Sequence, residues 1–386
     1  MARKQVLVAG VDVAADACTV VVRDVETWEV VRRGRAACVP GSGPGEWWTT
    51  LLAAVADAGQ LTGVSALAVA ALPGVVLLDG AGAVLDPARI PREDELADAA
   101  AGLVAEVGAA RFAERTGFVP TAAAPIAFLR WLRDADPDTA ARVDAVCAPH
   151  DWLTWRLRGF GATGEGVLGP QLEELATDRS EISTTGWWNP ATARHEHALL
   201  NTALGHAAIK PRVMRADGWG GESAKLPQAG IRTGCIIGVG GRRRAAAVFG
   251  LDARAGEGIV FAGEGAGAVV AVSESPTHDE SGIVQGFADL SGAYLPDVAV
   301  TEISADGVAA AIDVLRAASV RVTGVLLVEG NQDASVRGIP DLSALSTALG
   351  VPVTRAPAGD HVADGMAAQA AWALTRRRVQ TRTASA

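Results

Sequence analysis

Three consecutive arginines, Arg242 to Arg244, follow a glycine-rich turn and precede an alanine-rich segment that predicts a helix at residues 245–249. Positive charge at a helix N-terminus opposes the helix dipole, so three arginines are locally unfavourable there. Such a conflict with a local rule is typical of functional sites, and guanidinium groups bind carboxylates and phosphates through two parallel hydrogen bonds. The cluster therefore indicates either an anion site or a solvated, charged start of a helix.

The elements that would position this cluster divide into two halves. The first half has short strand patterns, an amphipathic helix that begins at Pro44, and a helical pattern from 93 to 135. A helix at 149–157 is expected to have His150 or Asp151 as its N-cap. Residues 159–169 are glycine-rich and predict a loop. Strands are expected at 6–11, 19–22, 28–31, 66–70, 75–78 and 143–147.

The second half begins near Ile236 and repeats the order of strands followed by strand–helix units. Two such halves predict two related α/β domains with a ligand cleft between them. The expected division is 1–236 for the first domain, 237–375 for the second, and 376–386 for a basic, disordered tail. Within the second domain, strands are expected at 259–262, 268–272, 324–328 and 351–353, and helices at 308–318, 342–349 and 363–375.

Composition excludes several classes of protein. The 386 residues carry 44 acidic and 34 basic side chains, a net charge of −10, which repels nucleic acids and anionic membranes. No apolar stretch of about 18 residues predicts a membrane span, and no secretory signal follows the N-terminus. The four cysteines form no C-x-x-C pair that would indicate a zinc or redox site. A cytoplasmic protein is expected, with no nucleic-acid or membrane partner.

Four segments of the chain carry a resemblance to a known family. They are Gly10-Val11-Asp12-Val13 with Thr19-Val20-Val21-Val22, Val146 to Gly159, Thr177 to Trp188, and Val362 to Ala367. These segments resemble the FGGY carbohydrate kinases, and among them the xylulose kinases of actinobacteria. The resemblance implies two actin-like, ribonuclease-H-like α/β domains around a cleft that binds ATP and a sugar, with a truncated second domain, because the stretch between Pro296 and Val308 is short. Tryptophan and leucine at helical spacing in the second segment also fit a scaffold role.

The catalytic position departs from the family pattern. The family has Gly-Gly-Asp-Asn before an alanine helix, and alignment on the alanines places Arg243 at the position of the general base. Arginine stays protonated and cannot accept a proton. Since a carboxylate near a helix start suits the dipole, Arg243→Asp is expected to stabilise the fold slightly without restoring activity.

The residues at the phosphate-binding and sugar-binding positions also depart from the family pattern. The family's Asp-x-Gly-Thr loop is Asp12-Val13-Ala14-Ala15 here, so Asp12 remains as the implied metal ligand. The second phosphate loop has lost its hydroxyl groups and gained Glu264, and the adenosine loop has gained Glu329. The sugar motif has become Ala71-Leu72-Pro73-Gly74, in which Gly74 alone is retained. The resemblance implies these remnants of the nucleotide and phosphate cleft: Asp12, Gly240, Gly241, Gly265, Gly267, Gly330 and Gly365.

Three functions stay open. The first is a xylulose kinase-like homologue that is inactive or strongly impaired, a pseudokinase. The second is an active sugar kinase with a displaced base such as Glu222, Asp252 or Glu264, which would use ATP and Mg²⁺ as cofactors. The third is a non-enzymatic partner of an active paralogue. A sugar or a nucleotide is the expected small-molecule ligand, and both a homodimer and a heteromer with the paralogue stay open.

Overall fold

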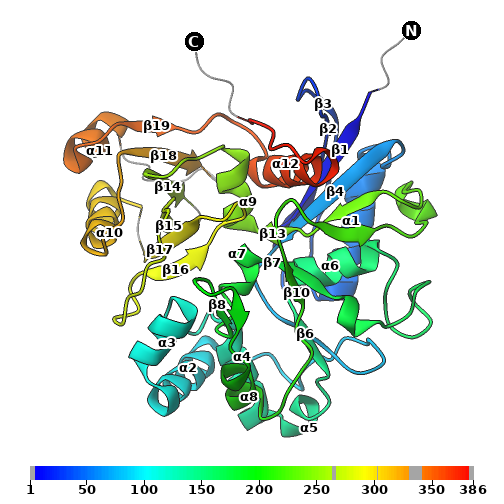
Figure 1. Ribbon diagram of the computed structural model, residues 1–386, viewed down its shortest axis with the longest axis horizontal. Helices are drawn as coiled ribbons and strands as arrows, with labels where there is room; N and C mark the ends of the chain where they lie inside the picture. The colour runs from blue at the N-terminus through cyan, green and yellow to red at the C-terminus, as the bar shows by residue number, and fades with distance from the viewer. Residues whose placement is uncertain (1–4, 263–266, 302, 330–340, 382–386) are drawn as a thin grey trace.

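Two mixed β-sheets organise the chain, one in each half (Figure 1). The computed structural model describes residues 5–262, 267–301, 303–329 and 341–381, with the Glu329 side chain left aside. In the first sheet, β1 pairs with β2 and β2 with β3 in antiparallel fashion, while β4 and β12 continue the sheet in parallel on the other side of β1. Its strands are β1 (Leu7–Val13), β2 (Ala17–Asp24), β3 (Val30–Ala37), β4 (Val64–Ala71), β11 (Trp219–Glu222), β12 (Ile236–Gly238) and β13 (Gly241–Arg242).

The second sheet repeats this arrangement. An antiparallel meander leads into two parallel strands, in the order β16-β17-β15-β14-β18-β19. The prediction of two related α/β units is therefore confirmed by the shared strand order. The strands are β14 (Glu257–Ala262), β15 (Gly267–Ala271), β16 (Gln285–Ala288), β17 (Tyr294–Val300), β18 (Gly324–Glu329) and β19 (Val353–Arg355).

In the structure, the chain passes from the first sheet to the second later than expected. Strands β12 and β13 both pair with β4, so the predicted division at residues 236–237 lies inside the first sheet. The chain enters the second sheet through α9 (Arg243–Gly250) and then β14. It returns to the first sheet at its end, since α12 (His361–Thr375) packs on β1 and β4. A strand pattern shows that a segment is extended, whereas its pairing partner is set by tertiary contacts.

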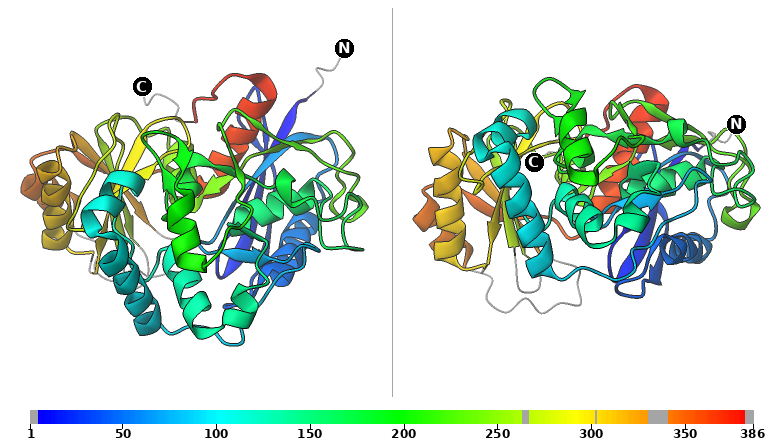
Figure 2. Two further views of the ribbon diagram at one scale, coloured as in Figure 1. Left: turned by 60° about the horizontal axis from the view of Figure 1, so that its bottom comes forward. Right: turned by 90° about the horizontal axis from the view of Figure 1, so that it is seen from below.

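Helices cover both sheets. Residues of β1 alternate between two cores: Ala9 and Val11 face α1 (Pro44–Asp57), and Val8 faces α12. Helices α10 (Ala305–Ala317) and α11 (Leu342–Leu349) lie on the side of the second sheet that is away from α12 (Figures 1 and 2). No helix in the described ranges is both long and apolar enough to cross a membrane.

A largely helical insertion with its own core lies between β4 and β11. Helix α6 has the predicted bounds, and Trp152 and Trp155 are buried in the core of the first domain. Its N-cap is Ala148 rather than His150 or Asp151, because the Asp151 carboxylate reaches back to accept the Ala148 N–H at 2.8 Å. The insertion contains β5 (Val76–Leu78), α2 (Glu93–Val107), α3 (Ala109–Thr116), α4 (Pro125–Ala135), α5 (Pro137–Ala140), β6 (Ala145–Cys147), α6 (Pro149–Leu157), β7 (Ala176–Asp178), α7 (Arg179–Ile182), β8 (Trp188–Asn189), β9 (Arg194–His195), α8 (His197–Leu204) and β10 (Arg212–Met214).

Two further findings differ from the expectations. Strands β16 and β17 were not predicted, whereas the passage from β17 to α10 is short, as expected. The start of the tail is held in place: Arg376 lies over the Trp219 ring, and Arg378 lies over Phe249 and 3.3 Å from Asp252. The prediction of disorder is therefore wrong for these two arginines. The sequence alone could not show that their guanidinium groups contact aromatic rings elsewhere in the chain.

Helices α9 and α12 cross in very close contact at glycine. A Cβ atom on Gly365 of α12 would lie 1.9 Å from the carbonyl oxygen of Ala246, and one on Gly10 of β1 would lie 1.8 Å from the carbonyl oxygen of Ala363. Backbone atoms cannot yield as a flexible side chain can. These contacts hold α12 between α9 and the first sheet, and thereby fix where α9 begins.

We predict that Gly365→Ala lowers the free energy of unfolding by about 1–3 kcal/mol or more, because the added methyl group forces the two helices apart. Gly45→Ala in α1 is the matched control, since its Cβ would meet nothing within 4 Å. That control should leave stability unchanged or raise it by up to ~1 kcal/mol. Urea unfolding of both variants measures the difference, and equal stabilities would contradict this account of the contact.

Candidate functional site

A cavity of about 660 Å³ opens between the first sheet, the insertion and strands β16 and β17. One wall is the arginine cluster at the start of α9, and the opposite wall comes from the insertion. The described residues that line it are Ala71, Pro73, Gly74, Phe118, Thr121, Ala123, Ala124, Pro125, Glu181, Thr184, Arg242, Arg243, Arg244, Gly282, Ile283, Gln285, Phe287, Asp297 and Ala299.

Arg243 forms a bidentate ion pair with Asp12. Its Nε donates to Oδ1 at 2.6 Å and its Nη2 donates to Oδ2 at 3.0 Å. Desolvation opposes the charge of the guanidinium, but the charge of Asp12 and these hydrogen bonds outweigh it, so the pKa of Arg243 is raised above its ordinary value. The residue at the expected base position thus stays protonated, and both carboxylate oxygens of the expected metal ligand accept its hydrogen bonds.

The other two arginines share one carboxylate. Oδ2 of Asp297 accepts from Nη1 of Arg244 at 2.6 Å and lies 3.5 Å from Nη2 of Arg242. The Arg242 guanidinium also lies 4.5 Å from the centre of the Phe287 ring. Burial, and then the charge of Arg244, lower the pKa of Arg242 below its ordinary value despite the opposing effect of Asp297. The cluster is therefore partly buried and each of its arginines is paired with a carboxylate.

The predicted sugar motif lies where the resemblance implied, but without its polar groups. Ala71, Pro73 and Gly74 all line the cavity. Sugar hydroxyls need paired donors and acceptors, and an apolar wall leaves them unsatisfied. Gly74 lines the cavity, and a sugar-binding role for it stays a prediction.

A buried polar cluster beneath the cavity was missed by the sequence analysis. His150 is fully buried, with Nε2 3.0 Å from Oδ1 of Asp151 and Nδ1 3.6 Å from Oε2 of Glu181. Burial opposes the imidazolium, but the two carboxylates outweigh it and hold the pKa of His150 well above its usual value. Burial also raises the pKa of Asp178 to about 6. The signal lay in two motifs, Pro149-His150-Asp151 and Thr177-Asp178, whose proximity only the fold reveals.

The retained glycines that the structure describes occupy packing contacts. Gly240 has φ +85°, and the Gln369 side chain of α12 hydrogen-bonds to both its N–H and its carbonyl group. Gly241 and Gly267 lie in strands, and Gly365 lies at the crossing of α9 and α12. Gly265 and Gly330 lie outside the described residues. A nucleotide-binding role for these glycines stays a prediction.

The described residues do not fit a catalytic magnesium ion. Asp12, the one implied ligand, already binds the Arg243 guanidinium through both oxygens. No group of three or more histidine, cysteine, aspartate or glutamate side chains in the described part of the chain could hold a metal ion. A dication would also meet three guanidinium groups at this wall.

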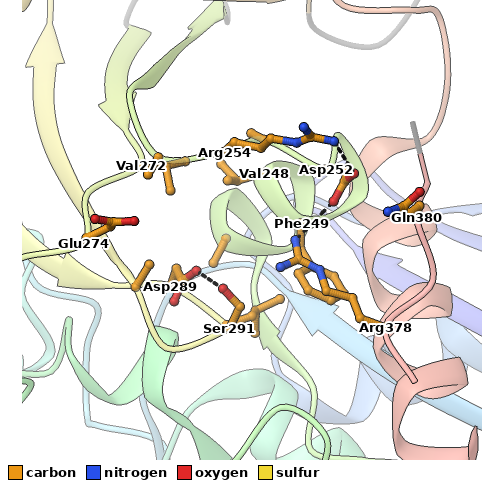
Figure 3. A pocket seen from close by; sticks show the side chains of 15 residues that line it. Val248, Phe249, Asp252, Arg254, Val272, Glu274, Asp289, Ser291, Arg378 and Gln380 are labelled. Atoms are coloured by element: carbon orange, nitrogen blue, oxygen red, sulfur yellow. Dashed lines mark hydrogen bonds and ion pairs between the residues drawn. The ribbon is translucent and has the colours of Figure 1, made fainter. Parts of the chain in front are cut away.

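A second cavity of about 570 Å³ lies beside the other end of α9 (Figure 3). Asp252, one of the alternative bases, lines it and is held there by Arg378. Glu222, another alternative, ends β11 and lines neither of these two cavities. Glu264 lies outside the described residues. Among the described residues, the carboxylates that line the 660 Å³ cavity are instead Glu181 and Asp297.

Comparisons with known proteins agree with this fold and site. The N-terminal domain of the FGGY family of carbohydrate kinases matches residues 41–250. The xylulose kinase of Streptomyces coelicolor is 34% identical over 303 residues, which is 75% of this chain and 59% of that protein. The xylulose kinase of Streptomyces rubiginosus is 33% identical with the same coverage. These matches thus span less than two thirds of the length of either relative.

Solved structures show the same architecture. The xylulose kinase of Bifidobacterium adolescentis superposes with a TM-score of 0.87 at 27% identity, covering 97% of this chain and 94% of that one. Plasmodium falciparum glycerol kinase has a TM-score of 0.78 at 11% identity, covering 97% and 90%, a likeness of fold alone. The protein thus has the two-domain, actin-like α/β fold. The chain belongs to the FGGY family of carbohydrate kinases, and it is xylulose kinase-like within that family.

We predict that His150 makes stability depend on pH. A folded-state pKa above the ordinary 6.5 means that the stability contributed by the imidazolium is complete below pH 6.5 and is lost as the pH rises through the folded value. At pH 6, His150→Gln should cost about 3–5 kcal/mol, because it leaves buried carboxylates unpaired. The difference from the unmodified protein should shrink steadily towards pH 9.

Urea unfolding at several pH values measures this difference. His278→Gln, which changes an exposed histidine, is the matched control and should show little difference at any pH. A cost for His150→Gln that does not change between pH 6 and pH 9 would mean that the folded-state imidazole does not carry the proton.

Proposed function

We propose that this xylulose kinase-like FGGY homologue does not carry out ATP-dependent phosphorylation of a ketose, and that the Asp12–Arg243 ion pair is the principal reason. Phosphorylation of a hydroxyl group needs a group that accepts its proton and metal charge that neutralises the phosphates. Here one ion pair removes both functions, since a cation occupies the base position and binds the expected metal ligand. Loss of a positioned base alone lowers a rate by about 10²–10⁴-fold.

The apolar part of the cavity lining at the predicted sugar motif supports the same proposal independently. Ala71 and Pro73 present no hydrogen-bonding side chain to the cavity. A ketose would therefore lose hydration without gaining partners at this wall. Positioning of the reactants can supply about 7–11 kcal/mol of a barrier, and that contribution requires specific contacts.

An active kinase with a displaced base is the alternative. Of the carboxylates that line the cavity, Asp297 binds two guanidinium groups, while Glu181 has a buried Oε2 without a hydrogen bond from any described residue. Glu181 is therefore the residue on which this alternative depends.

We predict no D-xylulose-dependent formation of ADP by the purified protein in a coupled assay with MgATP. The xylulose kinase of Streptomyces coelicolor is the positive control. We also expect MgATP to leave the melting temperature unchanged, since only a ligand that binds the native state raises it. Turnover in the usual enzymatic range of about 1–10³ s⁻¹ would contradict the proposal. Loss of such turnover in Glu181→Gln would then identify the displaced base.

We further predict that Arg243→Asp does not restore activity and destabilises the protein. This corrects the expectation from the helix dipole, because the substitution places a second carboxylate beside Asp12 and removes its partner. The side chain of Arg243 is 36% exposed, so we expect a loss of about 1–2 kcal/mol, between the values for surface and buried pairs.

A double-mutant cycle with Asp12→Asn and Arg243→Gln separates the pair from other effects. The cycle should give a favourable coupling energy of about 1–2 kcal/mol. A coupling energy near zero would show that Asp12 and Arg243 do not stabilise each other. Robust sugar-dependent turnover of Arg243→Asp would show instead that the cavity is still a kinase site and that the apolar sugar-motif residues do not prevent catalysis.

A further inference from the structure

The cavity combines a cationic wall with an apolar wall. Three guanidinium groups face it from the start of α9, and the two carboxylates among its lining residues are Glu181 and Asp297. The rest of the lining is largely apolar and includes two aromatic rings, of which Phe287 lies against Arg242. The apolar lining residues are Ala71, Pro73, Phe118, Ala123, Ala124, Pro125, Ile283, Phe287 and Ala299.

The guanidinium charge is compensated unevenly within the protein. Asp12 pairs with Arg243, Asp297 is shared by Arg242 and Arg244 through a single oxygen atom, and the charge of Glu181 also acts on Arg242. Arg244 therefore has only a shared carboxylate, and its side chain is 41% exposed, so water screens part of its charge. A second anion placed in the cavity would complete this arrangement.

Arg244 is the arginine best placed to bind a ligand. Its side chain is 41% exposed, and among described partners it donates one hydrogen bond, from Nη1 to Asp297. A guanidinium group has five N–H donors in a planar fork that matches a carboxylate. Arg242, by contrast, is held over the Phe287 ring.

A second polar feature of the cavity is Glu181 of α7, whose charge also acts on Arg242. Glu181 is 2% exposed and lines the cavity, yet its Oε2 accepts no hydrogen bond from the described residues. Its nearest charged partner, His150, lies 3.6 Å away without forming a hydrogen bond. A buried acceptor of this kind is costly unless a donor reaches it. Because Oε2 has almost no exposed surface and faces His150, a hydroxyl group on the ligand would meet the carboxylate only where Glu181 lines the cavity.

We propose that the cavity binds a small organic carboxylate with an apolar body and a hydroxyl group, in place of a neutral ketose. The carboxylate binds the Arg244 guanidinium, the apolar body lies against Phe118 and Ile283, and the hydroxyl group donates to Glu181. This inference rests on the proposed loss of ketose phosphorylation, because it assigns the same cavity to another ligand.

Isothermal titration calorimetry without nucleotide tests the proposal with 4-hydroxybenzoate, benzoate, 4-hydroxybenzamide and D-xylulose as probes. We expect 4-hydroxybenzoate to bind most tightly, benzoate more weakly because it lacks the hydroxyl group, and 4-hydroxybenzamide at least tenfold more weakly because it lacks the charge. D-xylulose should not bind. Binding of 4-hydroxybenzoate should weaken as the salt concentration rises.

Two variants with a matched control locate the site. Arg244→Gln should weaken 4-hydroxybenzoate at least tenfold, and Glu181→Gln should remove the advantage of 4-hydroxybenzoate over benzoate. Arg254→Gln, which changes an arginine that lines the other cavity, should leave binding unchanged. Circular dichroism of each variant checks that it is folded.

Several outcomes would overturn the inference. These are equal binding of 4-hydroxybenzamide and 4-hydroxybenzoate, no binding of either carboxylate, and carboxylate binding that survives Arg244→Gln. Such results would leave the proposed loss of kinase activity intact, since that depends on ADP formation. ADP formation from D-xylulose together with binding of that sugar would instead overturn both.

Discussion

The ion pair between Asp12 and Arg243 joins the end of β1 in the first sheet to the start of α9, the helix that leads into the second sheet. It is bidentate, so it fixes the orientation of the guanidinium group as well as its position. It lies where the two halves of the chain meet, between the cavity and the first sheet. Both oxygens of Asp12 accept hydrogen bonds from the guanidinium group, which makes Asp12 a poor ligand for a metal ion.

Its position is set by unusually close packing of backbone on backbone. Gly10 of β1 and Gly365 of α12 allow β1, α12 and α9 to approach at distances that a Cβ atom would forbid. Gln369 of α12 then binds both backbone groups of Gly240, just before the arginines. Glycines that resemble phosphate-loop remnants therefore have a structural reason to be glycine, whether or not a nucleotide binds.

The cavity joins a shared scaffold to side chains of this chain's own. The family's fold persists through both sheets, and the cavity between them is lined by arginines and mostly apolar groups. The buried cluster of His150, Asp151 and Glu181 reaches this cavity through Glu181, which lines it together with the three arginines. Membership of the family thus identifies the architecture, and the chemistry depends on individual side chains.

Local signals in the sequence were enough to predict many of the helices and strands. Helices α6 and α11 have the predicted bounds, because apolar periodicity and the Pro, Asp and Gly residues at their ends act within a few positions. Strands β16 and β17 escaped prediction, since Gly286 and Pro296 interrupt their patterns and their stability comes from pairing with each other and with β15. The sequence also determined that no proton acceptor stands at position 243, because arginine keeps its proton in any fold. Only the tertiary structure decided that Arg243 meets Asp12, 231 residues away, and that Asp297 is shared by Arg242 and Arg244. Contacts over such separations depend on how the two sheets pack, which no local pattern of residues encodes.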